Sequence, residues 1–145
     1  MQVDFYHLTR SPIDRVLPQI ATRILSDGGR LLIVADAQTI RTRLDASLWT
    51  WSAESFLPHA QTGRGDDSLQ PVLIAGAIGQ ANGARNVALA DGMWRDEALD
   101  FDRAFHFFDE DQITQARAAW KGLAGRDGVE RRYWKQTDTG WEQAG

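Results

Sequence analysis

The spacing of apolar and polar positions near the start of the chain predicts a strand followed by an amphipathic helix. Residues 3–8 alternate and include two aromatic side chains, which is typical of a strand. Ser11 followed by Pro12 has the pattern of a helix N-cap with proline at the first helical position. The apolar positions after it predict a helix to about residue 27, ended by the Gly28-Gly29 pair.

The next part of the chain repeats this order of strand and helix. Residues 30–35 form a continuous apolar run, which is typical of a strand buried on both faces of a parallel sheet. A second helix is expected at residues 37–49, because apolar side chains recur there at helical spacing. Residues 50–70 then read as a long connection, with a polar run near its end.

Two apolar runs in the middle of the chain predict two further strands, at residues 71–77 and 86–90. The Asn82-Gly83 pair between them indicates a turn, which favours an antiparallel hairpin. Residues 103–108 predict another strand, because they are almost entirely apolar and aromatic.

The last quarter of the chain predicts one more helix and an extended end. The acidic residues 109–111 would cap and charge the start of a helix at 112–123. Residues 133–137 read as extended, and the sequence after them turns toward Trp141. The whole pattern predicts a single three-layer α/β domain over residues 1–145, with a Rossmann-like outline and a central, mostly parallel sheet flanked by helices. Such an outline alone does not give a function.

Composition excludes several kinds of site. The chain of 145 residues has no cysteine, which excludes a disulfide framework, a thiolate zinc site and a cysteine nucleophile. Only three histidines are present, so a histidine-rich metal site is not expected either. The start of the chain lacks the pattern of a signal peptide, and no apolar run approaches the roughly 18–20 residues that span a bilayer. We therefore expect a cytoplasmic protein without a membrane segment.

Charge is unevenly distributed along the chain. Residues 1–111 carry 10 basic and 16 acidic side chains, for a net charge of −6. Residues 112–145 carry 6 basic and 4 acidic side chains, for a net charge of +2. An acidic body argues against broad nucleic-acid binding, so any DNA contact should be indirect or weak. The basic end leaves room for a local site for an anionic partner.

No assembled catalytic or cofactor site emerges from the motifs. The turn after the first predicted strand contains no glycine, and neither Lys121 nor Lys135 follows a phosphate-loop pattern. The acidic groups at 66–67 and 109–111 could bind a cation, but a solvated loop and a helix start are the favoured interpretations. His59 could act as a general base, although a lone loop histidine more often makes only a hydrogen bond. We expect no catalytic residue, no metal and no cofactor.

Two patches are better candidates for binding. Arg117, Trp120 and Lys121 share one face of the last predicted helix, which suits a carboxylate beside an apolar side chain. The alternative is that Trp120 packs in the core while the two cations are merely solvated. Large apolar residues also crowd residues 48–59, where they either pack under the loop or face a partner.

The same stretches carry a resemblance to a known family. The segment Leu44-Asp45-Ala46-Ser47-Leu48-Trp49 followed by Glu54-Ser55-Phe56-Leu57-Pro58-His59 resembles the most specific stretch of the chi subunit family of bacterial DNA polymerase III. Similar pieces occur along the chain at residues 10–12, 15–18, 71–74 and 82–84, and at 117–121 followed by Tyr133-Trp134. The resemblance spans nearly the whole chain.

This resemblance implies a non-catalytic accessory subunit with a Rossmann-like fold. Members of the family attach to the clamp loader through the psi subunit, and they hold the acidic C-terminal tail of single-stranded DNA-binding protein, which ends in phenylalanine. Carried over by position, Trp49 and Phe56 would face psi. The tail pocket would consist of Arg117, Trp120 and Lys121, with Tyr133 and Trp134 nearby. The tail's terminal carboxylate would pair with Arg117 or Lys121, and its phenylalanine ring would pack beside Trp120.

The chain departs from the family in two places. Some members carry a basic residue where this chain has Ile113, and the sequence continues beyond Trp134. Two other functions remain as alternatives: a small α/β nucleotide-binding protein or enzyme, and an adaptor for peptide tails outside replication.

Overall fold

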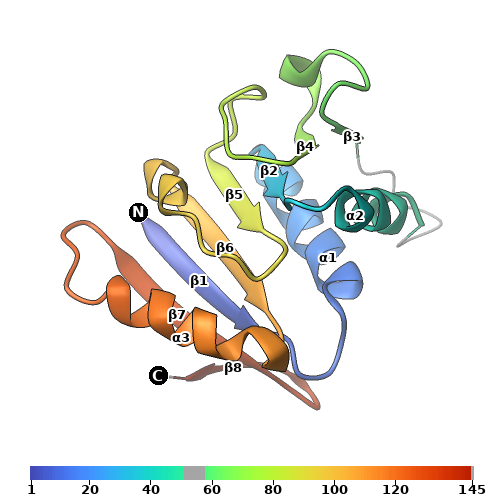
Figure 1. The fold of residues 1–145 in the computed structure, drawn as a ribbon. Coiled ribbons are helices and arrows are strands. Elements are labelled where there is room, and N and C mark those ends of the chain that lie inside the picture. Colours follow the sequence, from blue (N-terminus) through green and yellow to red (C-terminus); the bar gives the residue numbers. More distant parts are fainter. Residues whose placement is uncertain (51–57, 145) are drawn as a thin grey trace.

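The apolar runs of the chain come together in one mixed sheet. The computed structural model describes residues 1–50 and 58–144, and within them eight strands follow the order β3-β4-β2-β5-β6-β1-β7-β8 (Figure 1). All neighbouring strands are parallel except β7 and β8. The strands are β1 (Gln2–His7), β2 (Leu31–Val34), β3 (His59–Gln61), β4 (Val72–Ala75), β5 (Asn86–Leu89), β6 (Arg103–Phe108), β7 (Glu130–Thr137) and β8 (Gly140–Ala144).

Helices pack against both faces of this sheet. The α-helices of the described residues are α1 (Ile13–Ser26), α2 (Gln38–Thr50) and α3 (Ile113–Gly122), and the 3-10 turns are η1 (Asp67–Leu69), η2 (Asp96–Asp100) and η3 (Glu110–Gln112). Leu17 of α1 and Leu44 of α2 share one core with Ile33 of β2. Ala116 of α3 belongs to a second core with Leu32 of β2. Because successive strand residues point to opposite faces, the two cores lie on opposite sides of the sheet.

The predicted Ser11 N-cap is wrong. Helix α1 begins at Ile13, and Pro12 occupies the N-cap position without a side-chain hydrogen bond. The reason is a tertiary contact. The side-chain oxygen of Gln136 on β7 accepts hydrogen bonds from the backbone N–H groups of Arg10 and Ser11, each 2.9 Å long. This contact ties the segment after β1 to β7 and moves the helix start beyond the serine. The predicted glycine stop is confirmed, because Gly28 has a φ of 79° directly after the helix.

The predicted hairpin between residues 71–77 and 86–90 is also wrong. Strands β4 and β5 both pair with β2 in parallel, one on each side of it. Val72 to Ile74 are buried on both faces, which requires a central place in the sheet. The Asn82-Gly83 turn exists, but the buried amide of Asn82 donates to the carbonyls of Leu31 and Gln70 and anchors the connection to β2.

Other expectations hold in part at the ends of the sheet. The predicted acidic cap falls one turn early, because Asp109 and Gln112 form the capping box of η3, whereas the N-cap of α3, Gln112, makes no side-chain capping bond. The turn toward Trp141 is confirmed as the antiparallel β7–β8 pair. Strand β3 was not predicted, since it has only three residues and lies inside the long connection. Across the described residues, no helix has the length and apolar character that crossing a membrane requires.

Candidate functional site

Trp120 and Tyr133 meet where α3 crosses the sheet. Strand β7 lies parallel beside β1, with Tyr133 opposite Phe5 in the register. The Trp120 ring lies 5.7 Å from the Tyr133 ring and 5.3 Å from the Phe5 ring, both centroid to centroid and nearly perpendicular. These distances are typical of edge-to-face aromatic pairs. The structure thus joins two of the residues expected in the tail pocket, from elements separated by a loop.

Both basic residues expected beside Trp120 are exposed on α3. Arg117 and Lys121 are solvent-accessible, while Trp120 is only partly buried and packs against the second core. Trp120 is therefore neither a fully exposed binding residue nor a fully buried core residue. Trp120 contributes to the packing of α3 on the sheet, and it is also partly exposed on the helix that carries Arg117 and Lys121, neither of which forms an ion pair within the described residues.

The charge of Arg117 reaches Tyr133. Burial raises the pKa of the Tyr133 phenol above its ordinary value, although the Arg117 guanidinium lowers it and the Glu110 carboxylate raises it. The Tyr133 hydroxyl also lies 3.3 Å from Nδ1 of His7, whose Nε2 lies 2.9 Å from the Glu110 carboxylate. The phenol thus lies within the field of a cation on α3.

Trp134 is not brought together with Trp120. It follows Tyr133 on β7, so its side chain points to the opposite face of the sheet. There its indole N–H donates to Oδ1 of Asp4 at 3.0 Å. The same buried carboxylate pairs with Arg103 and Arg132, at 2.9 Å and 3.2 Å. Trp134 therefore belongs to a cluster around the buried Asp4 carboxylate, on the face of β7 opposite Tyr133.

Arg131 also contacts Trp120, although the sequence did not predict it as a site residue. Its Cζ lies 3.9 Å from the centroid of the Trp120 ring, and its Nη1 donates to the Trp120 carbonyl at 2.7 Å. Arg131 and Tyr133 are two residues apart on β7 and therefore share the face that α3 covers. This alternation was visible in the sequence, but the placement of α3 over that face was not.

The second patch is only partly described by the structure. Leu48 is buried at the end of α2, whereas the Trp49 side chain is 52% exposed. The Trp49 ring lies 4.7 Å from the ring of His59 at the start of β3. Phe56 lies outside the described residues.

The chain matches a known family over most of its length. Residues 1–130 match the family described as DNA polymerase III chi subunit, HolC. The chain belongs to this family. It is also 32% identical over 95 residues to a protein of Escherichia coli (strain K12) named DNA polymerase III subunit chi. That match covers 66% of this chain and spans 63% of the length of the curated relative.

The family match includes most of the expected site residues of this chi-family chain. Trp49, Phe56, Arg117, Trp120 and Lys121 all lie within residues 1–130. The matched range ends before the part of β7 that carries the remaining two, at positions 133 and 134. The resemblance inferred from the motifs is thus confirmed at the level of the family.

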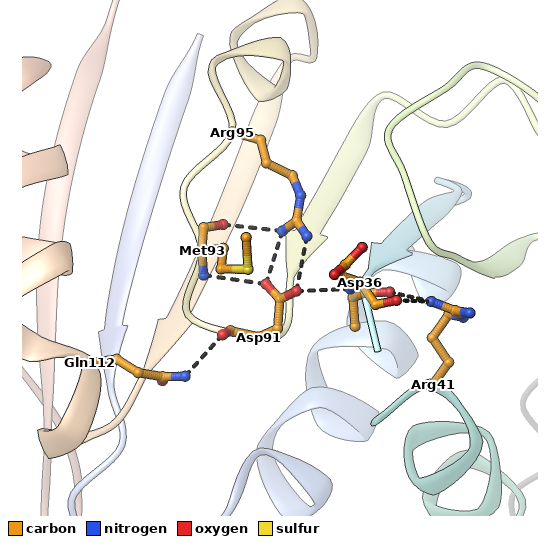
Figure 2. Close-up of polar contacts among 7 residues, drawn as sticks. Asp36, Arg41, Asp91, Met93, Arg95 and Gln112 are labelled. Carbon is orange, nitrogen blue, oxygen red and sulfur yellow. Dashed lines mark hydrogen bonds and ion pairs between the residues drawn. The ribbon is translucent and has the colours of Figure 1, made fainter. Parts of the chain in front are cut away.

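A buried ion pair fixes the start of α3 in this chi-family chain (Figure 2). The Asp91 carboxylate accepts two hydrogen bonds from Arg95, each 2.9 Å, and others from the backbone N–H groups of Asp36 and Met93. The Asp91 carbonyl accepts a bond of 2.9 Å from the Gln112 amide. Burial raises the pKa of the Asp91 carboxyl, but these hydrogen bonds lower it by more and hold the pKa below its ordinary value. The network ties the ends of β2 and β5 to the turn that leads into α3.

A cavity of about 550 Å³ opens at the carboxyl ends of β1 and β6. Its wall includes Arg10, Ser11, Asp109 and Gln112, over a floor that includes Phe107. Open α/β sheets bind ligands at this edge, but the segment that follows β1 contains no glycine to admit a phosphate chain. Among the described residues, no three acidic, histidine or cysteine side chains gather as metal ligands would.

Proposed function

We propose that this chi-family chain is a non-catalytic accessory subunit of the DNA polymerase III holoenzyme. It links the clamp loader to single-stranded DNA-binding protein by binding that protein's acidic C-terminal tail, and it works in the cytoplasm without a cofactor. The three-layer Rossmann-like arrangement inferred from the sequence is part of the same proposal. The observation that carries it is the surface of α3, where Arg117 and Lys121 flank a partly exposed Trp120.

The tail would bind through one apolar contact and a few charge pairs. Its terminal carboxylate would pair with Arg117 or Lys121, and its phenylalanine ring would pack beside Trp120 and Tyr133. The partial negative charge of a helix end also favours a cation in the last turn, where Lys121 lies on α3. Because these cations are exposed, the binding should be weak, sensitive to salt and strengthened by multivalency.

Trp134 has a supporting place in this proposal. It lies on the opposite face of β7, where its bond to Asp4 helps to fix the strand. We therefore assign direct contact with the tail to Arg117, Trp120, Lys121 and Tyr133.

The clamp-loader side would use the other end of the molecule. We propose that Trp49 and Phe56 contact the psi subunit or an equivalent partner. The support in the described residues is the Trp49 indole, which is large, aromatic and 52% exposed. Large exposed aromatic side chains are common anchors of protein interfaces.

Titration calorimetry with an acidic peptide ending in Asp-Asp-Ile-Pro-Phe tests the tail site. We expect binding in the micromolar range for the wild type, loss of binding in Arg117→Ala and weaker binding at high salt. Trp49→Ala is the matched control, because it removes an exposed side chain from the other patch and should bind the peptide like the wild type. Absence of binding by the folded wild-type protein would refute the tail site.

The cavity at the ends of β1 and β6 is the observation that favours the alternative of a nucleotide-binding protein or enzyme. A thermal-shift screen against nucleotides distinguishes the two functions. The proposed scaffold should show no shift, whereas a concentration-dependent rise in Tm with one nucleotide class would favour the alternative.

A further inference from the structure

Arg131 occupies a distinctive place on the proposed tail surface. Its guanidinium covers one face of the Trp120 indole and donates to the Trp120 carbonyl. We propose that Arg131 is a specificity-determining residue that binds a side-chain carboxylate in the acidic segment ahead of the tail's terminal aromatic residue. This inference rests on the proposed function, and it assigns one part of the tail to one residue.

The stacking of Arg131 limits where the two parts of the tail can lie. One face of the Trp120 ring is covered by the guanidinium at 3.9 Å, which leaves no room there for a second ring. The tail's aromatic side chain must therefore use the rest of the indole surface, toward the cations on α3. In an extended peptide bound in this way, the residues before the terminal aromatic residue lie on the side away from the terminal carboxylate. Arg131 borders the same indole from β7, so it can reach those residues while α3 holds the carboxyl end.

Arg131 also keeps its charge available. A guanidinium has five N–H donors, and within the described residues the only bond from Arg131 goes to a neutral carbonyl. Seven of the other 13 arginines form an ion pair with a carboxylate in the described residues. Those with an ion pair are Arg10, Arg43, Arg85, Arg95, Arg103, Arg126 and Arg132. In the described part of the chain Arg131 thus combines a fixed position with a charge that no carboxylate neutralises.

The chemistry of arginine suits a carboxylate at this position. Its planar fork can stack on an aromatic face and still offer paired N–H groups at its edge, which lysine cannot do. The Arg131 side chain is also partly buried, unlike that of Arg117. Partial burial strengthens an ion pair relative to a fully exposed one, and the existing stack lowers the entropy lost on binding.

An exchange of charges between protein and peptide tests this role. Titration calorimetry would compare peptides ending in Asp-Asp-Ile-Pro-Phe and Asn-Asn-Ile-Pro-Phe on the wild type and on Arg131→Gln. We expect the wild type to prefer the acidic peptide by about tenfold, the value of one good charge-assisted contact. Arg131→Gln should bind the acidic peptide about tenfold more weakly, with a residual preference below about threefold.

Two further variants serve as controls. Arg126→Gln removes the same charge from the loop between α3 and β7, where the side chain pairs, within the described residues, with Asp96 alone, at 3.7 Å. It should keep nearly the full preference for the acidic peptide. Arg131→Lys keeps the charge but loses the planar stack, so it should fall between the wild type and Arg131→Gln. It also tests the role if Arg131→Gln fails to fold, as judged by near-ultraviolet circular dichroism.

The outcomes separate this inference from the proposed function. If the acidic peptide binds the wild type but not Arg117→Ala, and Arg131→Gln keeps the full preference, the role of Arg131 is overturned and the tail site stands. An equal loss of preference in Arg126→Gln would also overturn it, because general electrostatics would then explain the effect. If the wild type binds neither peptide, both proposals fail.

Discussion

Acid should destabilise this protein through His106, which lies in the core beneath α3 and η2. The side chain is fully buried, with its ring 5.2 Å from the Phe5 ring and 5.6 Å from the Trp94 ring. Within the described residues neither ring nitrogen has a hydrogen-bond partner. Burial lowers the pKa of His106 from 6.5 to about 4. The Asp91 carboxylate raises this pKa and the Arg95 guanidinium lowers it, but burial is the largest effect.

The sign and size of the effect follow from proton linkage. The folded pKa is below the unfolded one, so the unfolded chain binds more protons and stability falls as the pH drops below about 6.5. At pH 5 the unfolded imidazole is almost fully protonated, whereas only about one-tenth of the folded imidazole is. The resulting loss of free energy of unfolding is about 2 kcal/mol at pH 5 and about 3 kcal/mol at pH 4.

Urea unfolding of the wild type and His106→Leu at pH 8 and pH 5 measures this loss. Leucine leaves no buried nitrogen without a partner and has a similar volume, so at pH 8 the two proteins should differ by less than about 1.5 kcal/mol. From pH 8 to pH 5 the wild type should lose about 2 kcal/mol relative to the variant. Comparing differences removes the acid response of every other group that both proteins share. A difference that stays constant with pH would show that His106 does not bind a proton on unfolding in this range.

Three further predictions concern α3 and its support. Asp91→Ala leaves the partly buried Arg95 with only the Met93 carbonyl as a partner among the described residues, so urea unfolding should show a loss of about 2–3 kcal/mol. Gly92→Ala should destabilise the protein by about 1–3 kcal/mol in the same assay, because the φ of Gly92 is 76° and a Cβ there would overlap the Gln112 side chain. Gly65→Ala is its control, because Gly65 has no left-handed φ and a Cβ there would meet open space. Spectrophotometric titration should place the pKa of Tyr133 above that of free tyrosine, and Arg117→Ala should raise it further, because the guanidinium lowers it; an unchanged or lower midpoint would contradict the placement of Arg117.

The fold was predictable where local pattern and tertiary demand agree. The continuous apolar run of β2 implied burial on both faces, and β2 does lie between two parallel neighbours. The Asn82-Gly83 turn was also correct, yet the hairpin inferred from it was wrong. A turn fixes only a local change of direction, and here a buried asparagine uses it to reach β2. Pairing partners depend on contacts across the whole sheet, which a local motif does not encode.

The site was predictable only in part, for a similar reason. Helical spacing was enough to place Arg117, Trp120 and Lys121 on one face of α3. Whether Tyr133 and Trp134 lie in the same pocket depends on how β7 packs beneath that helix. The alternation of a strand separates the two neighbours, and the same alternation brings Arg131 under Trp120. Residues on one element can thus be grouped from sequence, whereas contacts between elements need the fold.

The most direct test of the tail site is to follow the indole N–H signals of the six tryptophans by NMR while the Asp-Asp-Ile-Pro-Phe peptide is added. Assignment would use single Trp→Phe variants. We expect the Trp120 signal to move with a saturable dependence on the peptide concentration, while the signals of Trp49 and Trp134 stay in place. Trp134 is an internal control, because its N–H is held by Asp4 on the opposite face. A static Trp120 signal, or a shift confined to Trp49 or Trp134, would show that the peptide does not bind at α3.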